Sequence, residues 1–181
     1  MKLAQVRNCS RKIAPGVDCF LGENGYDKGQ ASRQATPLLP GYSISQSQGI
    51  MLLRSINATF FSGFDAYILY WLKDSEPENA PDVYLTSGIL RLMPDGKTIA
   101  YPGWYYISAL VNQLGNYVAD SVISEKGDVW IYKYRNALVP DSVAYFVYAP
   151  TVNGTKVPHY TLPVGNTTGD TVREMEFQDD S

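Results

Sequence analysis

The sequence contains few residues that could hold a metal ion or form disulfides. Cys9 and Cys19 are its two cysteines and His159 is its one histidine, in a chain of 181 residues. Two cysteines with no histidine near them do not complete a structural zinc site, and we expect neither a metal nor another cofactor. We expect both thiols to be free, although a single disulfide between them is possible. His159 has no serine or cysteine nucleophile motif beside it, so we expect it in a surface loop.

Strong charge of one sign and long apolar runs are missing as well. The net charge is −3, from 15 basic and 18 acidic residues. This balance lacks the basic patch of a nucleic-acid-binding domain, and no apolar run approaches the length of a membrane-spanning helix. We therefore expect no nucleic acid and no membrane among the partners. Residues 1–7 lack the apolar core of a signal peptide, and the localisation of the chain stays open.

Tyrosine, in contrast, is abundant. The chain has 14 tyrosines, and apolar residues make up 45% of it, which is enough for a buried core at this length. A tyrosine ring offers a flat apolar face with a polar tip, and this suits a carbohydrate or another wet ligand. A tyrosine-rich composition suits a β-rich domain equally well, so composition alone leaves both interpretations open.

The first half of the chain alternates between short apolar strands and helices. Apolar strands that are separated by a helix predict a parallel βαβ unit. Long loops follow both strands, and such loops are usually functional or mobile. The predicted elements are the end of an amphipathic helix with Leu3, Val6 and Ile13 inward, a buried strand over 17–22, a loop over 28–42, a helix from Ser43 or Ser45 to Gly63, a strand over 66–71, a loop over 73–102 and a helix over 104–114.

The second half changes to alternating patterns that predict antiparallel strands. Residues 117–124 and 128–134 are joined by Glu-Lys-Gly, which is a hairpin signal. A third strand is predicted over 143–148, with weaker candidates over 157–163 and 171–177. Short strands at this spacing predict an antiparallel sandwich. The fold class is therefore α/β plus all-β, with an α/β portion over 1–115 and an antiparallel β-sandwich module over 116–181.

Glu23 and Trp71 each stand at the end of a predicted strand. A carboxylate at the tip of a buried strand, next to an aromatic residue and a long loop, is well placed for catalysis. It could also be a surface carboxylate that caps a turn, and position alone favours that structural role. An aromatic ring such as Trp71 likewise serves either in packing or as a platform for a ligand.

Five segments of the chain match, in order, motifs of one enzyme family. They are residues 21–27 (Leu-Gly-Glu-Asn-Gly-Tyr-Asp), 48–54, 70–74 (Tyr-Trp-Leu-Lys-Asp), 84–90 and 101–106. The pattern resembles the end of a clan A glycoside hydrolase, from its seventh strand to its eighth helix. The β-rich tail resembles the sandwich that follows such TIM barrels in enzymes of the Bacteroidetes type.

The resemblance implies a fold in which 1–115 form the last two βα units of a (β/α)8 barrel and 116–181 form the trailing sandwich. The fourth strand of that family, with an acid/base glutamate in an Asn-Glu pair, has no counterpart here. Six barrel strands are missing, and Asn24 stands where the family has Phe or Tyr. The chain is therefore expected to be a fragment or a repurposed piece, with a second chain as a possible partner that completes the barrel.

The resemblance also implies roles for particular residues. Glu23 would be the nucleophile of a retaining glycosidase, and Trp71 would form the floor of the sugar site. Tyr26, Asp27 and Asp74 would contribute to substrate binding as wall or supporting residues. The implied function is retaining O-glycosyl hydrolysis of a poly- or oligosaccharide, with the nucleophile half of the site on this chain and a secreted or periplasmic location. The alternative is a non-catalytic β-sandwich module that binds carbohydrate or protein, or that is purely structural.

Overall fold

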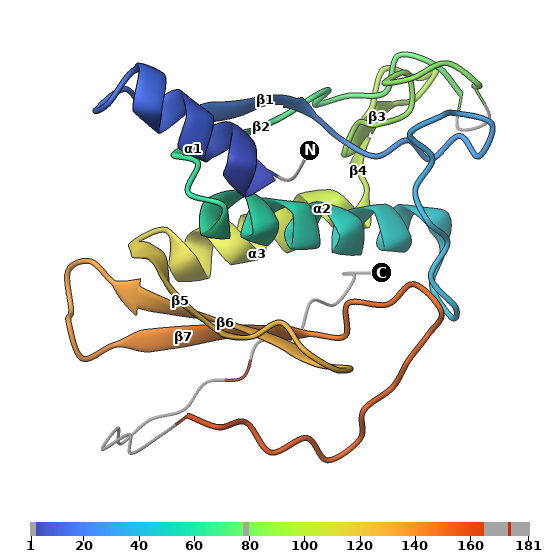
Figure 1. Cartoon of the computed structure of the whole chain (residues 1–181). Coiled ribbons are helices and arrows are strands. Elements are labelled where there is room, and N and C mark those ends of the chain that lie inside the picture. The colour runs from blue at the N-terminus through green and yellow to red at the C-terminus, as the bar shows by residue number, and fades with distance from the viewer. Residues whose placement is uncertain (1–2, 78–79, 165–173, 175–181) are drawn as a thin grey trace.

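A computed structural model describes residues 3–77, 80–164 and 174 of the chain. Figure 1 shows a layer of two helices between a pair of strands above and a separate sheet below. The elements are α1 (Leu3–Ile13), β1 (Phe20–Asn24), α2 (Ile44–Phe61), β2 (Ala66–Leu69), β3 (Leu90–Leu92), β4 (Thr98–Ala100), α3 (Pro102–Leu114), β5 (Tyr117–Ser124), β6 (Trp130–Asn136) and β7 (Val143–Tyr148).

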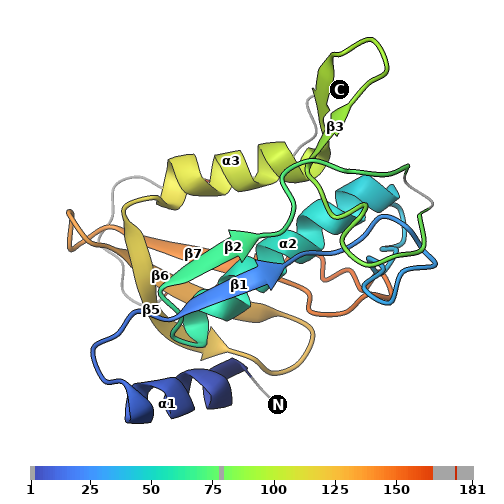
Figure 2. The ribbon, with the colours of Figure 1, turned by 90° about the horizontal axis from the view of Figure 1, so that it is seen from above.

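Strands β1 and β2 form a parallel pair, and α2 connects them. This confirms the predicted βαβ unit and, with the helices and antiparallel sheets, a mixed α/β architecture. The expectation of a buried first strand is wrong, because Val17 is 58% exposed and Phe20 is 56% exposed. Helix α2 covers one face of the pair, whereas the view from above in Figure 2 shows no described element over the other face. Ile68 on β2 is accordingly 48% exposed.

Helix α2 begins where a capping box satisfies its first backbone groups. The Ser43 hydroxyl accepts a hydrogen bond from the Gln46 N–H, and the Gln46 side chain accepts one from the Ser43 N–H. Ser43 is therefore the cap, and Ser45 lies inside the helix. Leu52, Leu53 and Ile56 form the buried apolar side of the helix. The helix ends before Gly63, which has a positive φ of 84°, a conformation that favours glycine after the last turn of a helix.

Helix α3 packs closely against α2 because a glycine stands at the contact. A Cβ atom added at Gly49 would lie 2.6 Å from the Tyr106 ring and 3.1 Å from the Cα of Gly103. Any side chain at 49 would push the helices apart. Helix α3 also starts two residues earlier than predicted, with Pro102 in the first turn, where a missing N–H costs nothing.

The lower layer is a three-stranded antiparallel sheet in the order β5-β6-β7. Its central strand faces α2, since the Phe61 ring lies 4.8 Å from Tyr132 and 5.0 Å from Tyr134. The Tyr134 hydroxyl also donates to Asn57 Oδ1 at 2.7 Å. Helix α2 therefore occupies the side of this sheet where a sandwich would place a second sheet, and no second sheet faces β5–β7 within 3–77, 80–164 and 174.

Two further strand predictions concern the end of the chain. The strand predicted over 157–163 is wrong, because the segment is irregular. Pro158 and Pro163 remove backbone donors there, and His159 has a positive φ of 56° that breaks an extended run. His159 is exposed, as predicted. The candidate strand over 171–177 lies outside the described residues apart from 174.

Helix α1 docks through a buried arginine and not through the full predicted apolar stripe. Arg7 donates to the Gly63 carbonyl at 2.6 Å and to Asp65 at 2.8 Å, and it is 5% exposed. Leu3 and Val6 are half-buried, but Ile13 is 79% exposed, so its inward placement is wrong. Arg11 in the last turn still donates to the Gly63 carbonyl at 3.4 Å, whereas Ile13 faces solvent. Both cysteines are free thiols, as expected.

A hairpin of β3 and β4 was not predicted within the long loop over 73–102. Its strands pair antiparallel, and the turn between them contains Pro94, Asp95 and Gly96. That triplet is a turn signal, but three-residue strands are too short to show a period. Figure 2 shows the hairpin projecting from the body of the molecule. Within the described residues, no helix combines the length and the apolar character needed to cross a membrane.

Candidate functional site

The candidate site lies where β1 and β2 end. Because the two strands run parallel, their C-terminal ends meet at one edge. Glu23 lies within β1, opposite Ile68, and not after the strand as predicted. Its side chain is exposed, and it makes no hydrogen bond or ion pair to any described residue. Glu23 is therefore a free carboxylate close to the end of the strand pair.

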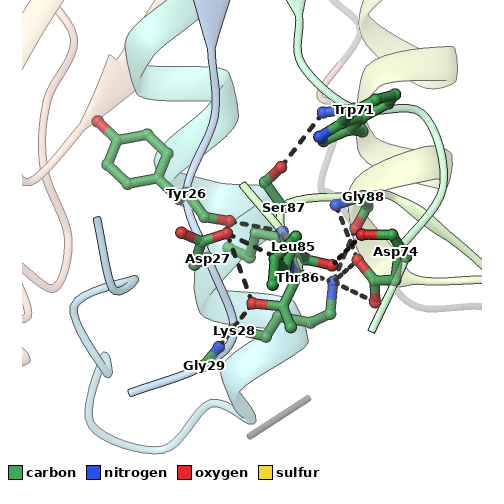
Figure 3. Close-up of polar contacts among 12 residues, drawn as sticks. Tyr26, Asp27, Lys28, Gly29, Trp71, Asp74, Leu85, Thr86, Ser87 and Gly88 are labelled. Atoms are coloured by element: carbon green, nitrogen blue, oxygen red, sulfur yellow. Dashed lines mark hydrogen bonds and ion pairs between the residues drawn. The ribbon is translucent and has the colours of Figure 1, made fainter. Parts of the chain in front are cut away.

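Trp71 lies at the same edge, shortly after β2, and is 45% exposed. The peptide bond that joins it to Tyr70 is cis. The backbone N–H of Trp71 donates to the Ser87 hydroxyl at 3.2 Å, and that hydroxyl in turn donates to the Tyr70 carbonyl oxygen at 2.7 Å. The Tyr70 ring packs 4.7 Å from the indole. Figure 3 shows the bond between the Trp71 backbone and Ser87. This bond and the Tyr70 ring hold the backbone and one side of Trp71 in place, while nearly half of the residue surface stays exposed.

Gly25 allows the chain segments after the two strands to approach each other. A Cβ atom there would lie 2.6 Å from the Tyr70 carbonyl oxygen and 3.2 Å from Ser87 Cβ. Only glycine fits this space. The residue that follows Glu23 and Asn24 therefore fixes the distance between the Glu23 segment and the Trp71 segment.

Asp27 is fully buried and ties two loops together. Its carboxylate accepts hydrogen bonds from the Ser32 hydroxyl at 2.6 Å, from the Tyr84 N–H at 3.0 Å and from the Thr86 N–H at 3.3 Å. No surface of Asp27 remains for a ligand, since its exposed fraction is 0%. Of the two roles expected for it, this geometry fits the supporting one.

Asp74 is also buried, and its partner is a lysine that the sequence did not reveal. Lys28 has no exposed side-chain surface and forms an ion pair with Asp74 at 3.0 Å. The same ammonium donates to the carbonyls of Thr86 at 2.9 Å and Gly88 at 2.7 Å, and it lies 4.1 Å from the centre of the Tyr101 ring. Burial raises the pKa of Asp74, and the Lys28 charge opposes that shift. No local signal distinguishes this lysine from one in an ordinary solvated loop.

Tyr26 points away from the other predicted site residues. Figure 3 shows its ring on the opposite side of the chain from Trp71. Its carbonyl accepts a hydrogen bond from the Gln48 side chain at 2.7 Å. The structure therefore divides the five predicted site residues. Glu23 and Trp71 share an exposed edge, Asp27 and Asp74 lie in the buried network beneath it, and Tyr26 belongs to another surface.

Comparison with known proteins does not assign this chain to a family. No family model, no curated protein and no solved structure matches the chain. The chemistry must therefore be judged from the site alone. An exposed carboxylate and an exposed indole are held at one edge by a buried network that includes two further carboxylates. Residues 3–77, 80–164 and 174 contain no group of acidic, histidine or cysteine side chains that could bind a metal ion.

Proposed function

We propose that this chain supplies the nucleophile half of a retaining glycoside hydrolase site. Glu23 is the nucleophile, and Trp71 is the platform on which a sugar ring stacks. The observation that carries the proposal is the shared position of these two side chains. Both are exposed, and both lie at the C-terminal ends of adjacent parallel strands. Barrel enzymes place their catalytic groups at this edge.

The five family-like segments support the same proposal from the sequence. Their order along the chain is that of the last two βα units of a barrel, and the parallel β1–β2 pair has the direction that such units require. The buried Asp27–Lys28–Asp74 network, which is joined through Thr86, gives the two acidic positions of the family-like segments a supporting role. It holds the loops after both strands, so that Glu23 and Trp71 keep their relative positions.

The chemistry requires a second carboxyl group. A retaining glycosidase has two carboxyls about 5–5.5 Å apart, of which one attacks the anomeric carbon and the other protonates the leaving oxygen. Of the three carboxylates in the family-like strand segments, Asp27 and Asp74 are buried and hydrogen-bonded, which leaves Glu23. The proposed acid therefore comes from a second chain that completes the barrel, and this chain alone should bind sugar without hydrolysing it.

The three tryptophans of the chain provide the test. Each indole N–H gives its own signal in a proton–nitrogen correlation spectrum, and substitution of each tryptophan by phenylalanine assigns the signals. Titration with a panel of neutral oligosaccharides should shift the Trp71 signal and leave the Trp104 signal in place. Glu23→Gln should retain this shift, and the chain should show no turnover of aryl-glycosides. A panel that leaves Trp71 unchanged, or robust turnover by the isolated chain, would contradict the proposal.

A protein-interaction role is the second candidate, and the exposed apolar side chains favour it. Phe20 and Ile68 are about half exposed on the uncovered face of β1 and β2, and Val111 of α3 is 60% exposed. Large apolar side chains that remain exposed are candidates for contact with a partner. This role is compatible with a partner that completes the barrel. As the sole function, it predicts no sugar-dependent change at Trp71.

A further inference from the structure

A second candidate binding surface lies on the other side of α2, away from Glu23 and Trp71. It is a depression of about 310 Å³ between α1, α2 and the β6–β7 sheet, and we call it the Arg54 depression. Its volume lies at the lower end of the range for small-molecule sites. The residues that line it and carry the argument are Tyr26, Arg54, Ser55, Trp130 and Tyr148.

Arg54 is a half-buried cation with no acidic partner in the part of the chain that the structure describes. One guanidinium nitrogen donates to the Thr151 carbonyl at 3.0 Å, and the Nε atom is buried with no hydrogen-bond partner. None of the ion pairs among the described residues includes Arg54. Burial lowers the pKa of Arg54, and the groups that oppose this shift are tyrosines and not carboxylates. A negatively charged group on a bound ligand would stabilise the Arg54 guanidinium, because hydrogen bonds between charged groups are the strong ones.

The walls of the depression are aromatic rings that are themselves well held. The Arg54 guanidinium lies 5.3 Å from the centre of the Tyr148 ring. The Trp130 ring lies 6.1 Å from Tyr148, and Tyr132 stacks on Tyr148 at 6.0 Å with an angle of 8° between the rings. The nearby carboxylate of Glu125 is occupied, because it accepts the Tyr132 hydroxyl at 2.7 Å. Flat apolar faces thus surround one unpaired planar cation.

We infer that the Arg54 depression binds a small carboxylate that is carried on a ring. The planar guanidinium matches a carboxylate through paired hydrogen bonds, and the rings of Trp130, Tyr148 and Tyr26 offer faces against which a flat or ring-shaped body can stack. An acidic sugar and an aromatic acid share this chemistry. The inference is independent of the proposed glycosidase site, since no residue of the Glu23 edge lines the depression.

The test uses the same three indole signals, with Trp130 as the reporter of the Arg54 depression, Trp71 as the reporter of the proposed sugar site and Trp104 as the internal reference. The probes are galacturonate, benzoate, glucose and inorganic phosphate. We expect galacturonate, benzoate or both to shift the Trp130 signal, with the responding acid showing which source of the carboxylate fits. Glucose lacks the charge and phosphate lacks the ring, so neither should shift the Trp130 signal as far as the responding acid does. Trp71 reports on the proposed sugar site, which makes failure at one site distinguishable from failure at the other.

Variants assign the effect to the guanidinium. Arg54→Gln should weaken acid binding by about tenfold or more, the loss expected for a charge-assisted pair. Arg33→Gln is the matched control, because Arg33 is exposed and makes no described contact, and it should bind as the parent does. If Arg54→Gln fails to fold, Arg54→Lys keeps the charge without the planar fork and should still weaken binding. The inference is overturned if Trp130 responds to neither acid, responds equally to glucose or phosphate, or responds unchanged in the Arg54 variants.

Discussion

Replacing the buried lysine beneath the candidate site should destabilise the whole fold. Lys28→Met keeps the length and the apolar stem of the side chain but removes the ammonium. Asp74 would then be a buried carboxylate without its cation, and the Thr86 and Gly88 carbonyls would lose the donor that they share. Breaking a buried ion pair from one side costs about 3–5 kcal/mol. For a chain of this size, such a loss corresponds to a fall in Tm of about 6–20 °C.

Urea unfolding, followed by circular dichroism and by tryptophan fluorescence, measures this loss. The double variant Lys28→Met/Asp74→Leu should be more stable than Lys28→Met, because it leaves no unpaired charge. Lys97→Met is the control, since Lys97 pairs with Asp95 at the surface and is 81% exposed, and its free energy of unfolding should hardly change. A loss below about 1 kcal/mol for Lys28→Met, the net value of an ordinary hydrogen bond, would refute the structural role assigned to the Asp27–Lys28–Asp74 network.

Two further predictions concern packing and pH. Gly49→Ala should lower the free energy of unfolding by about 1–3 kcal/mol, because the added methyl group overpacks against Tyr106. Gly22→Ala is the control and should have little effect, since a Cβ atom at 22 meets no atom within 4 Å. Equal urea midpoints for the two variants would contradict the close α2–α3 contact. Burial raises the pKa of Tyr26, Tyr67, Tyr134 and Tyr148. The unfolded chain loses these protons near pH 10 and the folded chain keeps them, so stability is complete below about pH 10 and falls as the pH rises above it. Urea midpoints measured across this range check the sign, and a midpoint that rises above pH 10 would show that these rings are not buried.

The local part of the fold could be predicted from the sequence. The limits of β7 agree with the prediction, and Ser43 was one of two proposed caps for α2. These features depend on residues close together in the chain, such as the Ser43–Gln46 capping box. The parallel direction of β1 and β2 was also predictable, because a single helix connects the two strands.

The environment of each site residue could not be predicted in the same way. Lys28 and Asp74 are 46 positions apart, and their burial depends on loops that fold back over both. Phe20 belongs to an apolar segment that predicts a buried strand, but it lies on a face that no described element covers. Tyr26 follows the Glu23 segment directly, yet its ring turns to the opposite side of the chain. Long-range packing decides each of these outcomes, and a local pattern carries no information about it.

Covalent labelling of Glu23 tests the central claim most directly. A fluorinated glycosyl donor with a dinitrophenolate leaving group needs no acid, because the phenolate departs without a proton. A Glu23 carboxylate oxygen would bond to the anomeric carbon as the bond to dinitrophenolate breaks, and the glycosyl group would remain on the protein. Mass spectrometry of the intact chain and of its peptides, over donors of several sugar types, should find one added glycosyl group on Glu23. Glu23→Gln should abolish it, and Glu76→Gln, at an exposed carboxylate outside the site, should not. Absence of labelling by every donor, or labelling that persists in Glu23→Gln, would contradict the assignment of Glu23 as a nucleophile.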